Sequence, residues 1–134
     1  MIEAPLNVLM GAIVPMIKAD PALNAIVGQG VYDRVPVAAV KPYISLGSAW
    51  EIQADADCIE AVEIGFRLDV WSEKIGAPEV RRIAHRVRSI LHEAEIDLPE
   101  GALAMIEHRR TDTMRDPDGV TSHAVVEMTA TIEL

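Results

Sequence analysis

Histidine is the residue of this chain best suited to metal binding or proton transfer near neutral pH, and the chain has four of them. His85 and His92 lie seven residues apart on one predicted helix, about 10 Å apart along its axis, which is too far to share a metal ion. His108 and His123 fall on the two strands of a predicted hairpin and could face each other, as a zinc site or a pH sensor. Because such histidines are more often ordinary polar-face residues, metal binding is kept only as an alternative.

Three other motifs begin like functional sites and do not continue as such. The glycines of 28–33 resemble a dinucleotide fingerprint, but they follow a predicted helix and open a strand, the reverse of what that site needs. Asp55, Asp57 and Glu60 start like a calcium loop but lack its central glycine and closing glutamate. Cys58 is a single cysteine with no cationic cluster beside it in the sequence. We therefore predict no catalytic residue, no cofactor and no metal, and we do not expect an enzyme.

The stretch TMRDPDGVTSHAVVEM, from Thr113 to Met128, is the most polar-looking candidate for an active-site loop. Asp116–Gly119 has the composition of a tight turn, with proline early and glycine where φ is positive. Apolar and polar residues alternate after this turn up to Leu134, and Leu103–Arg115 before it reads as extended. The pattern predicts a long β-hairpin whose charged residues lie at a solvated tip.

The rest of the chain shows mixed helical and strand periodicity. Pro15 is expected to kink or end the first helix, and Asp20 is expected to be the N-cap of the next one, with Gly28 ending it. The stretch AWEIQADADC at 49–58 has no clear period and is interpreted as a loop. The predicted elements are helices at 3–18, at 21–27 and at 78–93, and strands at 31–33, 43–46, 61–72, 103–115 and 124–134.

Length and composition indicate one globular domain, residues 1–134, with half of its residues hydrophobic. Because the strands cluster around one late helix, we predict an α+β fold with an antiparallel sheet of about four strands and helices on one face. The formal net charge of −9 disfavours stable DNA binding. The N-terminal segment has neither a basic start nor an apolar run of membrane length, so we expect a soluble protein and no membrane partner.

Exposed charge of opposite sign suggests that the chain associates with copies of itself. One face of the helix at 78–93 is rich in arginine, whereas the segment around 51–60 is acidic. Tryptophan and arginine are frequent anchors of protein interfaces. The candidate interface residues are Trp50, Glu51, Asp55, Asp57, Trp71, Arg81, Arg82 and Arg86.

Several short motifs follow one another along nearly the whole chain. They are Asp20-Pro21-Ala22-Leu23 with Gly28, Val31-Tyr32, Pro42-Tyr43-Ile44, Leu68-Asp69-Val70-Trp71-Ser72, and Arg115-Asp116-Pro117-Asp118-Gly119-Val120-Thr121 followed by His123. Their order and spacing resemble the tail-terminator (tail-completion, or neck) family of long-tailed phages, prophages and gene transfer agents.

This resemblance implies a structural virion protein of the tail neck, assembled in the bacterial cytoplasm. It implies a homo-oligomeric ring, a hexamer, which caps the head-proximal end of the tail tube and ends its polymerisation. Its partners would be the major tail tube protein and the head-tail connector or stopper protein, with DNA only passing through. The family has no catalytic residues to transfer to this chain.

Three alternatives remain open at this point. The chain could be another neck component, such as a stopper or adaptor. It could be a small metal-binding domain that uses His108 and His123, or a regulatory α+β dimer that binds a small ligand.

Overall fold

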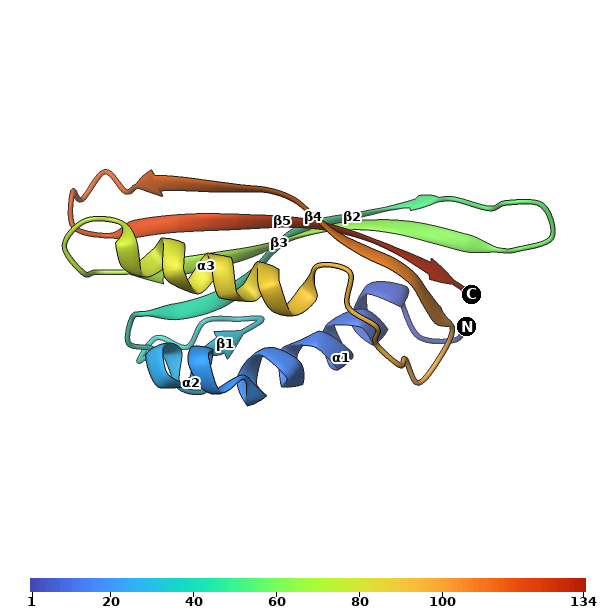
Figure 1. The fold of residues 1–134 in the computed structure, drawn as a ribbon, viewed down its shortest axis with the longest axis horizontal. Coiled ribbons are helices and arrows are strands. Elements are labelled where there is room, and N and C mark those ends of the chain that lie inside the picture. The colour runs from blue at the N-terminus through green and yellow to red at the C-terminus, as the bar shows by residue number, and fades with distance from the viewer.

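The computed structural model describes residues 1–134, which form three helices and a five-stranded sheet (Figure 1). The sheet order is β1-β2-β3-β5-β4, with β1 parallel to β2 and every other pair antiparallel. The elements are α1 (Pro5–Ala19), α2 (Pro21–Val27), β1 (Val31–Tyr32), β2 (Tyr43–Gln53), β3 (Ala61–Ser72), α3 (Pro78–Leu91), β4 (Ala102–Arg115) and β5 (Ser122–Glu133).

The α+β class and the helices on one face are as predicted, but the sheet is mixed and has five strands. The predicted strand at 31–33 is β1, whose two residues join the sheet as a fifth strand by pairing with Ile44 and Ser45 of β2. The chain passes from α2 into β1 and then through a loop into β2. This loop brings the chain back to the end of the sheet at which β1 began, so β1 and β2 run in the same direction. Alternation shows which face of a strand is buried and not the direction in which it runs, so the parallel pairing of β1 could not be predicted from the sequence.

The core lies between the helices and one face of the sheet. Alternate residues of β3 and β5 point into it, because successive strand side chains face opposite sides. Figure 1 shows α1, α2 and α3 on the same side of the sheet. The buried cluster includes Leu9, Ile13 and Ile17 from α1, Ile83 and Val87 from α3, and Ile64, Leu68, Val126 and Met128 from the strands.

Pro15 does not end α1, which continues to Ala19. The proline is exposed, and the carbonyl that its missing N–H leaves unbonded belongs to Gly11, which is also exposed. Water can therefore satisfy that carbonyl. Asp20 is the N-cap of α2 as predicted, and its carboxylate accepts the Leu23 N–H at 3.0 Å.

The hairpin between β4 and β5 confirms that the polar stretch is a bend. Asp116 N–H donates to the Thr121 carbonyl at 2.9 Å, and Gly119 has a φ of 73°. The Asp118 carboxylate accepts the Thr121 hydroxyl and the backbone N–H groups of Val120 and Thr121, and these bonds lower the pKa of Asp118. Its polar residues thus hold the turn together.

No single helix is long and apolar enough to cross a membrane; α1 and α2 together reach the length and composition but are bent by 81° at their junction.

Candidate subunit interface

The β2–β3 hairpin ends in an acidic arm, defined here as residues 49–60. Residues 49–53 are the second half of β2, so the expectation of a loop there is wrong. The residues of β2 beyond Ala49 are exposed on both faces of the hairpin, which leaves no alternation to read from the sequence. The arm carries four carboxylates and no lysine or arginine. Figure 1 shows its tip projecting beyond the rest of the sheet.

The three predicted acidic residues of the arm have two different roles. The Asp55 carboxylate accepts the Ala61 N–H at 2.9 Å and the Gln53 side-chain N–H at 2.7 Å, so it closes the hairpin end. Glu51 and Asp57 are exposed and make no ion pair within the chain. Their charge is therefore available to another molecule.

Trp50 lies on the face of the sheet that the helices leave uncovered. Its indole occupies the space over Gly65, where an added Cβ would collide with the ring. The side chain is still 49 % exposed. Together with Arg67, Arg109 and Glu127 it lines a shallow cleft of about 420 Å³. Trp50 is thus held by its own strand pair and keeps half of its surface free.

Trp71, the other predicted aromatic anchor, already has partners in its own chain. Its ring is stacked on the imidazole of His123, and its Nε1–H donates to Ser45 Oγ at 3.1 Å. His123 Nε2 lies 2.8 Å from an oxygen of Asp69. Trp71 is half-buried by these contacts, so it offers less free surface than Trp50.

The three predicted arginines of α3 divide into two kinds. Arg81 and Arg82 are exposed and make no ion pair within the chain. Arg86 donates two hydrogen bonds, of 2.7 and 3.0 Å, to the carboxylate of Asp20. These bonds lower the pKa of Asp20 and raise the pKa of Arg86. Arg86 therefore ties α3 to the start of α2, and its charge is already neutralised.

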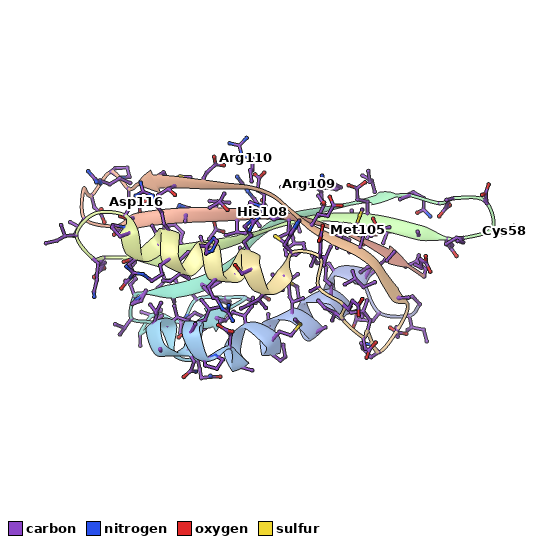
Figure 2. All side chains as sticks on the ribbon, viewed as in Figure 1. Cys58, Met105, His108, Arg109, Arg110 and Asp116 are labelled. Atoms are coloured by element: carbon purple, nitrogen blue, oxygen red, sulfur yellow. The ribbon has the colours of Figure 1, made fainter.

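The predicted interface residues form two separate surfaces. Figure 2 shows Cys58 at the tip of the arm and Asp116 at the opposite end of the molecule. The first turn of α3, with Arg81 and Arg82, lies at the Asp116 end in the ribbon view (Figure 1). The acidic arm and the free arginines are therefore far apart within one subunit.

His108 and His123 do not face each other, which removes the cross-strand pair on which the alternative of a metal-binding domain depends. In the β4–β5 register His108 lies opposite Met128, and His123 lies opposite Met114. No group of three or more His, Cys, Asp or Glu side chains is arranged to hold a metal ion. His108 instead accepts from the Nε–H of Arg88 at 3.3 Å, and its backbone N–H donates to His92.

Sequence reasoning missed a set of ion pairs on the uncovered face of the sheet. Arg67 pairs with Glu127 at 3.2 Å, Arg110 with Asp112 at 2.7 Å, and Arg109 with Glu107 at 3.2 Å. Figure 2 shows Arg109 and Arg110 projecting from the side opposite to the helices. The polar positions of β5 predicted a solvated face. Which charged side chains meet on that face depends on the strand order and on two bulges in β4, and no local pattern in the sequence reveals either.

Comparison with known proteins identifies the family. Residues 11–133 match the family described as Tail completion protein gp17. The chain belongs to this tail completion family. The resemblance expected from the sequence motifs is therefore confirmed.

A solved structure agrees with this assignment at the level of the fold. A chain in a structure titled "Virion of native gene transfer agent (GTA) particle" is 25% identical in sequence to this chain, with a TM-score of 0.90. The alignment covers 98% of both chains. No curated protein matches the sequence.

Proposed function

We propose that this tail completion protein forms a ring, a hexamer, at the head-proximal end of a phage-like tail. The ring ends polymerisation of the tail tube protein and joins the tail to the head connector. The family match and the fold of the gene transfer agent chain support a virion role of this kind. The proposal assigns no catalytic residue and no cofactor to the chain.

The observation that carries the ring is the separation of unpaired charge between the two ends of the subunit. Glu51 and Asp57 are free at one end, and Arg81 and Arg82 are free at the other. A contact between unlike ends is heterologous and repeats from copy to copy, closing into a ring when the rotation permits. A two-fold contact of the arm with the same arm of a second copy would instead place carboxylates against carboxylates, which repels.

Exposed apolar surface on the arm supports the same contact. Trp50, Ile52 and Ile59 are each about half exposed, at 49 %, 51 % and 48 %. A neighbour that covers these large apolar side chains would stabilise the contact by about 25 cal/mol per Å² of apolar surface buried. The ion pairs would then supply orientation and specificity rather than most of the binding energy.

The charge distribution also fits DNA as a passing molecule rather than a bound one. Arg67, Arg109 and Arg110 on the uncovered face all have carboxylate partners in the same subunit. DNA affinity comes largely from cations that are free to replace the counterions of phosphates. Paired arginines on a chain with a net charge of −9 offer little of that affinity.

The proposed function is tested by deleting the gene from the element that encodes it and examining the particles by electron microscopy. We expect tail tubes of uncontrolled length and tails without heads, restored to normal by the gene in trans. Tails of normal length that fail to join heads would assign the chain to a stopper or adaptor instead. Normal, infectious or transducing particles would refute both neck roles.

A further inference from the structure

The sheet has two outer edges, and each is only partly covered. At the first edge, β1 pairs only with Ile44 and Ser45 of β2. The outer side of β2 from Gly47 to Gln53 therefore has no neighbouring strand, although its inner side pairs with β3. Unpaired strand edges offer a row of backbone donors and acceptors to another chain, and proteins normally block them. No proline or lysine blocks this one, since Gly47–Gln53 reads GSAWEIQ, and its pairing with β3 is regular from Ala49 to Gln53, beyond the irregularity between Leu46 and Ala49.

The β4 edge is blocked in one part and free in another. Glu93 N–H donates to the Ile106 carbonyl at 2.9 Å, and the N–H of His108 donates to His92 at 3.0 Å. Bulges also interrupt β4 between Leu103 and Met105 and between His108 and Arg110. From Thr111 to Arg115 the register against β5 is regular, and the outer edge has no such cover.

We infer that the free edge of β2 in one copy pairs with the free edge of β4, Thr111–Arg115, in the next copy. This rests on the proposed ring. The four long strands β2, β3, β5 and β4 are antiparallel to their neighbours in that order, so β2 and β4 run in opposite directions. The two free segments lie at opposite ends of the subunit, so strands inclined to the ring axis let a rotated copy bring its free β4 segment antiparallel to the free β2 segment. The same step repeats around the ring, and successive sheets join without leaving open edges.

The side chains of the two free edges favour this pairing. Trp50 and Ile52 lie opposite Gly65 and Glu63 on the uncovered face, and Met114 lies opposite His123 on the same face. All three of these apolar side chains are between 43 % and 51 % exposed. Joining the edges places a methionine beside an indole and a branched aliphatic side chain, a contact that methionine makes favourably.

Charge distinguishes this partner from the other edge that could pair with β2. Two β2 edges brought together would align Glu51 and the other arm carboxylates with one another, and like charges opposite each other destabilise a strand pair. The β4 segment ends at Arg115, which is exposed and makes no ion pair within the chain. The positive charge of Arg115 is therefore complementary to the carboxylates of the acidic arm.

Cysteine cross-linking in purified particles tests the inference. In a Cys58→Ser background, Ile52→Cys is combined with Met114→Cys, and the particles are treated with a short bis-maleimide. We expect a ladder of multimers of this chain on a denaturing gel, whereas each single variant stays at the monomer position. Val37→Cys with Met114→Cys is the matched control, since Val37 is fully exposed in the β1–β2 loop, and it should stay monomeric.

The outcomes separate this inference from the proposed function. Particles that contain the ring but give no ladder with the double variant would overturn the edge pairing alone, and a dimer from Ile52→Cys alone would replace it with a two-fold contact. Absence of any ring of this chain would remove both. If the variants do not enter particles, hydrogen exchange of the wild-type chain decides. We expect amide protection at 47–53 and 111–115 to rise in the ring relative to the free subunit, and unchanged exchange would refute the pairing.

Discussion

The indole of Trp71 on β3 is stacked on the imidazole of His123 on β5, with ring centroids 3.8 Å apart and planes 9° from parallel. The two residues are cross-strand partners in the β3–β5 register. On the face that the helices leave uncovered, this pair shelters an aromatic side chain that would otherwise be exposed. Trp71 therefore contributes first to the stability of the subunit.

Replacing His123 with alanine should lower the free energy of unfolding by about 1–2 kcal/mol, because it removes the stacking partner of Trp71. Chemical denaturation followed by tryptophan fluorescence measures this change. His85→Ala is the control, since His85 is exposed and its ring has no hydrogen-bond partner in the chain; its effect should stay within about 0.5 kcal/mol. Equal effects of the two substitutions would contradict the assigned role of the stack.

Charge reversal should separate Arg82 from Arg86. Arg82→Glu should leave the melting temperature near that of the wild type and weaken ring assembly, because Arg82 is free in the subunit. Arg86→Glu should lower the melting temperature, because it places a carboxylate beside Asp20 and loses the pair that joins α3 to α2. Calorimetry and light scattering measure the two effects. Normal assembly of Arg82→Glu would count against the proposed contact with the acidic arm.

His108 should make the subunit less stable as the pH falls. Partial burial is the main cause that lowers its pKa from the usual 6.5, and electrostatic interactions with Arg88 and His92 add to it. The unfolded chain thus binds a proton at this residue before the folded chain does. The contribution of neutral His108 is complete above about pH 6.5 and declines as the pH drops from there toward the lowered folded pKa.

His108→Asn should therefore lose less stability than the wild type between pH 7.5 and pH 5.5. Urea unfolding at the two pH values measures the difference, and His85→Asn serves as the matched control on an exposed histidine. If the pH dependence of His108→Asn matched that of the wild type, the attribution to His108 would be wrong.

Elements with a clear period could be predicted from the sequence, and elements without one could not. The alternation in 61–72 matches β3, and the arginine-rich amphipathic run matches α3 to within two residues. The second half of β2 was missed because residues 50–53 are exposed on both sides, so burial imposes no alternation on them. Its strand conformation comes from pairing with β3, which is a tertiary contact.

The candidate site shows the same limit. Residue type alone selected the acidic arm and the arginines of α3, and the structure places these groups at opposite ends. The pair between Arg86 and Asp20 joins residues 66 positions apart, so the sequence could not show that Arg86 is already neutralised. His108 and His123 also lie at different distances from the hairpin turn, so they fall opposite Met128 and Met114 and not opposite each other.

Electron cryomicroscopy of the intact particle tests the central claim most directly. The account predicts density for this chain as a six-membered ring between the tail tube and the head connector, with the acidic arm of each copy against its neighbour. A different protein in that position, with this chain elsewhere in the particle or absent from it, would contradict the account.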